Sequence, residues 1–142
     1  MEIESVEADK KDRIGNKPLI LAVDNDLDNL LFARYAIESL GMNCLVCEDG
    51  RKTLELIYDF LPNLILLDIV MPNLSGIDIA REIKRDKNIQ QIPIIAVTGL
   101  TRELDKTLII EAGFDEYISK PYLIEDLEAK IDCALRKTEL GY

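Results

Sequence analysis

Short apolar segments, each followed at once by a polar residue, constrain the fold of this chain more than any other feature. The clearest is Leu64–Leu67, an unbroken apolar run that ends at Asp68 and is soon followed by Met71-Pro72. An apolar run of this length between such boundaries predicts a strand of a parallel sheet that is buried on both faces. Open α/β sheets bind their ligands at the carboxyl ends of such strands. Asp68 is therefore predicted to lie at a ligand-binding edge.

Three further segments repeat this arrangement. The pairs of strand and polar residue are Leu19–Val23 with Asp24, Ile94–Val97 with Thr98, and Tyr117–Ser119 with Lys120. Because the carboxyl ends of parallel strands meet at one edge, two carboxylates, a hydroxyl and an ammonium group should converge there. Such a set of groups predicts a site for a divalent cation and a phosphoryl group.

Strand and helix patterns alternate from Pro18 onwards with short connections, which predicts an α/β domain with a parallel sheet and right-handed crossovers. The expected strands are Leu19–Val23, Asn43–Glu48, Leu64–Leu67, Ile94–Val97 and Glu116–Ser119. The expected helices are Leu27–Leu40, Arg51–Leu61, Gly76–Arg85, Arg102–Ala112 and Ile124–Lys137. We expect a mobile tail over residues 1–17, one domain over 18–137 and a short tail over 138–142.

Composition excludes several classes of function. The net charge of −10 disfavours nucleic acid as a direct partner, because the chain would repel the phosphate backbone. No apolar run approaches the roughly 20 residues that span a bilayer and no signal peptide begins the chain, so a cytoplasmic location away from the membrane is expected. The chain has no histidine, which removes imidazole metal ligands and His-activated nucleophiles. A phosphohistidine donor would have to belong to another protein.

Cys44 and Cys47 form a C-x-x-C pair within a predicted strand. Residues three apart in a strand point to opposite faces, so ordinary packing is favoured over a redox or zinc site.

Five segments together resemble the receiver domain of bacterial two-component response regulators. They are Val23-Asp24-Asn25-Asp26, Leu67–Pro72 with Gly76, Val97-Thr98-Gly99, Ala112-Gly113-Phe114 and Tyr117–Pro121. Each is weak alone, but all five in this order at strand ends form a specific set that spans about Pro18 to Lys137. The resemblance implies a flavodoxin-like, doubly wound sheet of five parallel strands in the order 2-1-3-4-5 with five helices. The chain is similar to the single-domain, chemotaxis-regulator-like type.

The resemblance also implies the residues of a phosphorylation site. Asp68 is the phosphoacceptor, and Mg²⁺ is held by Asp24, Asn25, Asp68 and the backbone carbonyl of Val70. Asn25 departs from the family, which usually has a second acid at this position; an amide oxygen coordinates a cation but brings no charge. Asp26 either compensates for that charge or caps the following helix, and capping is favoured.

Five positions receive further roles from the same resemblance. Thr98 hydrogen-bonds a phosphoryl oxygen, and Lys120 pairs with the phosphoryl group or, in its absence, with Asp68. A cis Lys120–Pro121 peptide bond aims the lysine inward. Tyr117 is the aromatic residue that turns inward when the threonine moves. Val70 and Leu100 flank the approach of water to the phosphorus, and their apolar side chains predict a long-lived phosphoryl group.

The function expected from these residues is a signalling switch and not an enzyme, beyond self-catalysed phosphorylation and dephosphorylation. A histidine kinase or histidine phosphotransfer protein donates the phosphoryl group to Asp68. A downstream protein then binds the face formed by Arg102–Ala112, Glu116–Ser119 and Ile124–Lys137. The chain ends soon after its last predicted helix, so no output domain is expected in it. The alternative that the chain is a piece of a longer protein is kept.

Two alternatives remain at this point. A pseudo-receiver, which binds partners without being phosphorylated, is favoured only by Asn25 and disfavoured by Asp68, Thr98 and Lys120. A phosphatase resembling the haloacid dehalogenase superfamily would need a second acid two residues after Asp68, where Val70 stands instead. Labelling with a small acyl-phosphate donor would distinguish the pseudo-receiver from the switch.

Overall fold

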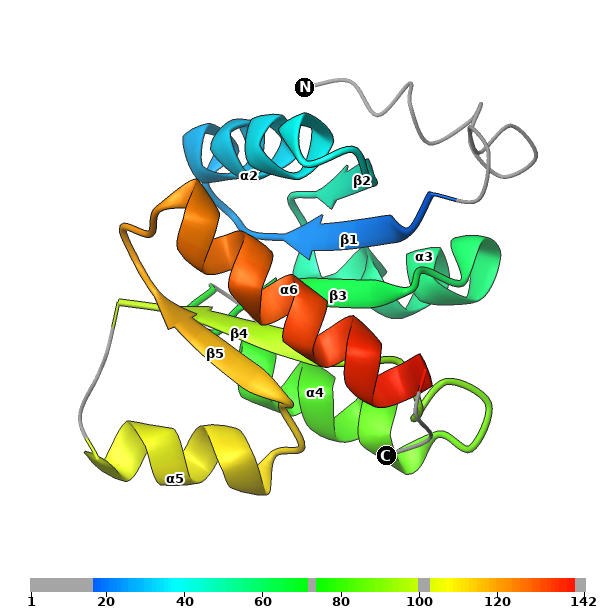
Figure 1. The fold of residues 1–142 in the computed structure, drawn as a ribbon. Coiled ribbons are helices and arrows are strands. Elements are labelled where there is room, and N and C mark those ends of the chain that lie inside the picture. The colour runs from blue at the N-terminus through cyan, green and yellow to red at the C-terminus, as the bar shows by residue number, and fades with distance from the viewer. Residues whose placement is uncertain (1–16, 72–73, 100–102, 140–142) are drawn as a thin grey trace.

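Five parallel strands form one sheet in the computed structural model, which describes residues 17–71, 74–99 and 103–139 (Figure 1). The strands are β1 (Leu19–Val23), β2 (Asn43–Cys47), β3 (Leu64–Asp68), β4 (Ile94–Thr98) and β5 (Glu116–Ser119). Their order is β2-β1-β3-β4-β5, which confirms the predicted flavodoxin-like topology. β1 is central: Leu21 pairs with Leu45 on one side and with Ile65 on the other.

Helices cover both faces of this sheet. The described residues form α2 (Leu27–Ser39), the 3₁₀ turn η1 (Gly50–Lys52), α3 (Thr53–Phe60), α4 (Gly76–Arg85), α5 (Glu103–Glu111) and α6 (Ile124–Glu139). α2 and α6 lie against one face, and α3, α4 and α5 lie against the other (Figure 1). Within the part of the chain that the structure describes, no helix is long and apolar enough to cross a membrane.

The core is two apolar layers, one on each face of the sheet. Every residue of β1, β3 and β4 is buried, as expected from the unbroken apolar runs of a doubly covered parallel sheet. Cys44 packs in the layer under α2 and α6, and Cys47 packs in the layer under α3 and α4. Both thiols are free, and their placement on opposite faces confirms that this pair is part of the packing.

Several predicted boundaries differ from the observed ones. The helix expected from Arg51 begins as the turn η1, because the Asp49 carboxylate accepts a hydrogen bond from the Arg51 N–H and starts a tight turn. It ends at Phe60, since Leu61 precedes a proline and adopts a left-handed φ of 47°. β2 ends one residue early, at Cys47, and α2 ends one residue early, at Ser39.

Four other elements have different ends. β3 and β4 each extend one residue beyond the prediction, so Asp68 and Thr98 are the last residues of their strands. The helix expected over Arg102–Ala112 is observed as Glu103–Glu111, and Arg102 lies outside the described residues. α6 continues to Glu139, two residues past the predicted end. Near this end, Lys137 Nζ lies 3.5 Å from Glu116 Oε2 of β5. The predicted N-terminal tail lies outside the described residues except for Lys17, and so do residues 140–142.

Candidate functional site

The parallel sheet brings the four predicted polar residues to one edge. Asp24 follows β1, Asp68 ends β3, Thr98 ends β4 and Lys120 follows β5. β1 and β3 are neighbours although they are not consecutive, and ligands bind at such a switch point in strand order. The residues Asp24, Asp68 and Thr98 are 6%, 3% and 1% exposed, so each is held in a low-dielectric environment.

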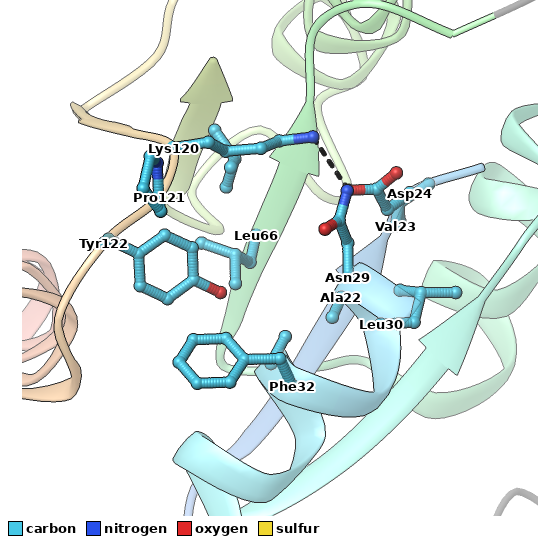
Figure 2. A pocket seen from close by; sticks show the side chains of 12 residues that line it. Ala22, Val23, Asp24, Asn29, Leu30, Phe32, Leu66, Lys120, Pro121 and Tyr122 are labelled. Carbon is cyan, nitrogen blue, oxygen red and sulfur yellow. Dashed lines mark hydrogen bonds and ion pairs between the residues drawn. The ribbon is translucent and has the colours of Figure 1, made fainter. Parts of the chain in front are cut away.

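Lys120 connects the two carboxylates. Its Nζ donates a hydrogen bond to Asp24 Oδ2 at 3.2 Å and lies 3.4 Å from Asp68 Oδ1. Figure 2 shows the lysine side chain extending from the β5–α6 connection to Asp24. The Lys120–Pro121 peptide bond is cis, and the Lys120 N–H donates to the Thr98 carbonyl at 2.8 Å. The contact between Lys120 and Asp68 was expected, whereas the contact with Asp24 was not.

These contacts leave the site with an excess of negative charge. Burial and the neighbouring Asp24 carboxylate raise the pKa of Asp68 from 3.8 to about 6, against the opposing effects of Lys120 and of a hydrogen bond from the Val70 backbone. Burial alone would lower the pKa of Lys120, but the carboxylates of Asp68 and Asp24 outweigh it and raise that pKa. Two carboxylates facing one ammonium group carry a net charge of −1, which attracts a further cation.

The donor atoms present suit Mg²⁺. This ion is usually bound by one or two carboxylates with water and phosphate oxygens completing the shell, and Asp24 with Asp68 meets that requirement. Asn25 is exposed, and its side-chain oxygen is a neutral donor of the hard type that Mg²⁺ accepts. Among the described residues, no three acidic, cysteine or histidine side chains gather in one place, so a cation at this edge would rely on two carboxylates together with neutral oxygen donors.

Asp26 acts as the cap of α2, which is the favoured of its two predicted roles. Its Oδ1 accepts from the Asp28 N–H at 2.8 Å and the Asn29 N–H at 3.3 Å, and its own N–H donates to Asp24 Oδ1 at 2.9 Å. The cap therefore fixes one oxygen of Asp24 while its own carboxylate is directed at the helix.

Gly76 supports the backbone at Asp68 more directly than its sequence context indicated. A Cβ atom at Gly76 would lie 2.2 Å from the backbone oxygen of Asp68, so glycine alone fits where α4 begins. The Gly76 N–H donates to the Ile69 carbonyl at 2.9 Å, and the Ile69 N–H donates to the Val97 carbonyl at 3.1 Å. These bonds fix the backbone just after Asp68. The glycine is apparent in the sequence, but its close approach to the Asp68 backbone could not be predicted from it.

Tyr117 lies on β5, where lysines of α5 and α6 approach its ring. Its half-buried ring packs against the layer of α3, α4 and α5 and has Lys130 Nζ 5.5 Å and Lys106 Nζ 5.9 Å from its centroid. The Val70 side chain is 62% exposed beside the site. Leu100, the other predicted neighbour of the attacking water, lies outside the described residues.

Comparison with protein-family models matches residues 20–132 to the response regulator receiver domain. Similar curated proteins include the phosphate regulon transcriptional regulatory protein PhoB of Pseudomonas aeruginosa, 38% identical over 122 residues, and the transcriptional regulatory protein CpxR of Klebsiella pneumoniae, 37% identical over 123 residues. These alignments cover 86% and 87% of this chain but 53% and 50% of the relatives. The chain thus spans about half the length of the curated relatives it matches.

Solved structures agree in fold. A CheY-like response regulator receiver domain protein from Methanospirillum hungatei has a TM-score of 0.81 and 27% identity, and the match covers 89% of this chain and 100% of that one. A putative response regulator from Chloroflexus aurantiacus has a TM-score of 0.82 at 21% identity over 85% of this chain and 99% of that one, which shows likeness of fold alone.

Proposed function

We propose that this chain, which belongs to the response regulator receiver domain family, accepts a phosphoryl group on Asp68 and works as a signalling switch. The observation that supports this proposal most strongly is the local environment of the Asp68 carboxylate. Its buried carboxylate ends a central strand with Lys120 Nζ at 3.4 Å and with Asp24 at the same edge. A structural aspartate at a strand end needs neither an ammonium group nor a second buried carboxylate beside it.

The proposed reaction is transfer from phosphohistidine. An oxygen of the Asp68 carboxylate attacks phosphorus, the P–N bond breaks, and its electron pair stays on the imidazole of the donor, which takes up a proton. The product is an acyl phosphate, as in other aspartyl-phosphate proteins. The donor belongs to a partner protein, a histidine kinase or a histidine phosphotransfer protein, because this chain has no histidine.

Charge repulsion between the carboxylate and the phosphoryl oxygens opposes this attack. Lys120 already lies at Asp68, so its ammonium group stabilises the added negative charge. Thr98 ends the neighbouring strand β4, and in this proposal its hydroxyl donates a hydrogen bond to a phosphoryl oxygen. Asp24, Asp68, the Asn25 amide oxygen and the Val70 carbonyl would hold Mg²⁺, which when bound supplies additional charge neutralisation.

The output is a change on the face of α5, β5 and α6, which a downstream protein binds. Tyr117 supports this choice, because it lies on β5 and its ring is flanked by Lys106 of α5 and Lys130 of α6. PhoB and CpxR are transcriptional regulators by name, but this chain matches only about half of each. The net charge of −10 favours a protein over DNA as the direct partner, and the cytoplasmic location and non-enzymatic role expected from the sequence are part of the proposal.

A pseudo-receiver is the second candidate, and Asn25 is the observation that favours it. Replacing an acid by an exposed amide lowers the charge available to a cation. Against it, Asp68 and Lys120 retain the geometry that phosphoryl transfer needs.

Intact-mass measurement with acetyl phosphate and Mg²⁺ tests the proposal. The wild-type chain should gain one phosphoryl group, EDTA should prevent the gain, and Asp68→Asn should abolish it. Asp78→Asn, which removes a carboxylate that is 59% exposed on α4, is the matched control and should be labelled normally. An unlabelled wild-type chain would support the pseudo-receiver, and labelling of Asp68→Asn would show that the acceptor is another residue.

A further inference from the structure

A cavity of about 450 Å³ opens beside the site, between α2 and the β5–α6 connection (Figure 2). It shares Asp24 and Lys120 with the phosphorylation site, but most of its lining is apolar and has no role in phosphoryl transfer. This lining includes Ala22, Leu30, Phe32, Leu66 and Tyr122. The volume falls within the roughly 300–1,000 Å³ that is usual for small-molecule pockets, which are also mainly apolar with a few polar groups.

Two polar side chains, those of Asn29 and Tyr122, line this cavity. Figure 2 shows the Tyr122 hydroxyl and the Asn29 amide turned toward the space between them. Within the described ranges, neither side-chain group forms a hydrogen bond. Burial, with smaller contributions from Asp24 and Cys44, raises the pKa of Tyr122 to about 12, so the hydroxyl stays protonated and can donate. A ligand oxygen that replaces water at this partly buried donor gives a modest net gain in affinity, because one hydrogen bond is exchanged for another.

The walls of the cavity determine the charge and shape that fit. Asp24 and Lys120 line the cavity, and Asp68, which does not line it, lies 3.4 Å from Lys120 Nζ. The three groups together carry a net charge of −1, so an anion entering beside them meets net repulsion. The rings of Phe32 and Tyr122 have centroids 5.5 Å apart and are tilted by 53°, which presents aromatic surface to an inserted ring. A neutral, flat molecule therefore suits this space better than a charged or branched one.

We propose that this cavity is a binding site for a neutral aromatic molecule of one or two rings that carries a carbonyl or hydroxyl group. The ring packs against Phe32 and Leu66, and the oxygen of the ligand accepts a hydrogen bond from the Tyr122 hydroxyl. The Asn29 amide donates to or accepts from the same polar group. The proposal does not depend on phosphoryl acceptance at Asp68, because the contacts that carry it lie outside the phosphoryl-transfer residues.

The probe for the test is 2-quinolone, a neutral two-ring lactam, titrated into the full ¹⁵N-labelled chain and followed by amide shifts. Saturable shifts are expected at cavity residues such as Ala22 and Ala33. Loss of one hydrogen bond in Tyr122→Phe should weaken binding about five- to tenfold. The matched control is Tyr35→Phe, which removes the same hydroxyl from a tyrosine of α2 that is 65% exposed and outside the cavity, and it should bind like wild type.

A second variant and a second probe test the contribution of Asn29 and the preference for a neutral ligand. Asn29→Ala should also weaken binding, and 2-naphthoate, a two-ring anion, should bind at least about tenfold more weakly than 2-quinolone. Absence of saturable shifts up to the solubility of the probe, or shifts confined to another surface, would overturn the proposal. So would equal affinity in wild type, Tyr122→Phe and Asn29→Ala, or tighter binding of 2-naphthoate.

Discussion

Asp68→Asn should stabilise the metal-free protein at neutral pH, although it removes the residue on which the proposed function depends. Asp68 is 3% exposed, and burial together with Asp24 raises the pKa of its carboxyl from 3.8 to about 6 even with Lys120 beside it. The ionised form is therefore less stable in the folded chain than in the unfolded one. Asparagine has the same shape and no charge, so it does not carry this penalty.

The size of this stabilisation follows from the linkage between protonation of Asp68 and folding. Because the folded pKa lies above the unfolded one, the folded state holds the proton more tightly, and stability is lost as pH rises through the interval from 3.8 to about 6. A shift of this size corresponds to about 3 kcal/mol at pH 8, where both states are ionised, and to about half of that at pH 5. The advantage of Asp68→Asn should grow accordingly between these two pH values.

Urea unfolding followed by circular dichroism, in EDTA at pH 5 and pH 8, measures this difference. Asp78→Asn is the control, because its carboxylate is 59% exposed and its removal should change the free energy of unfolding little at either pH. Adding Mg²⁺ should reduce the advantage of Asp68→Asn, since the cation stabilises the ionised site only in the wild type. An advantage no larger at pH 8 than at pH 5, or a loss of stability in Asp68→Asn, would refute the electrostatic account of the site.

Three further changes test individual roles. Asn25→Asp should tighten Mg²⁺ binding in calorimetry by adding a charged ligand, and unchanged affinity would mean that position 25 is not a ligand. Thr98→Ala should still be labelled at Asp68 but lose the change in hydrogen exchange on α5 and β5 that beryllofluoride causes in wild type; an identical change in both would exclude Thr98 as the relay. Val70→Asn with Leu100→Glu should accelerate loss of the phosphoryl group after the donor is removed, by about 10²-fold if the new side chains position a water, and an unaltered decay would show that water arrives by another route.

The sheet and its ligand-binding edge were predictable from sequence because the signal is local. Unbroken apolar runs such as Leu64–Leu67 are needed only where helices cover both faces of a strand, so they identify the strands and place Asp68 at a strand end. The separation of Cys44 and Cys47 onto opposite faces followed from the two-residue period of a strand.

Features that depend on several elements at once were not predictable in this way. The Asp24–Lys120 contact joins residues 96 positions apart, and its geometry depends on the β5–α6 connection. The close approach of Gly76 to Asp68 becomes visible only when α4 is placed against β3. The cavity near Tyr122 is lined by side chains of β1, β3, α2 and the β5–α6 connection, so no single segment of the sequence predicts it.

Reductive trapping of the acyl phosphate tests the central assignment most directly. After incubation with acetyl phosphate and Mg²⁺, borohydride reduces an aspartyl phosphate to homoserine, and peptide sequencing by mass spectrometry locates the altered residue. We predict homoserine at position 68 alone, with none in a sample prepared without the phosphoryl donor. Homoserine at position 24 or 26, or at no position in a chain that has gained a phosphoryl group, would contradict the assignment of Asp68 as the acceptor.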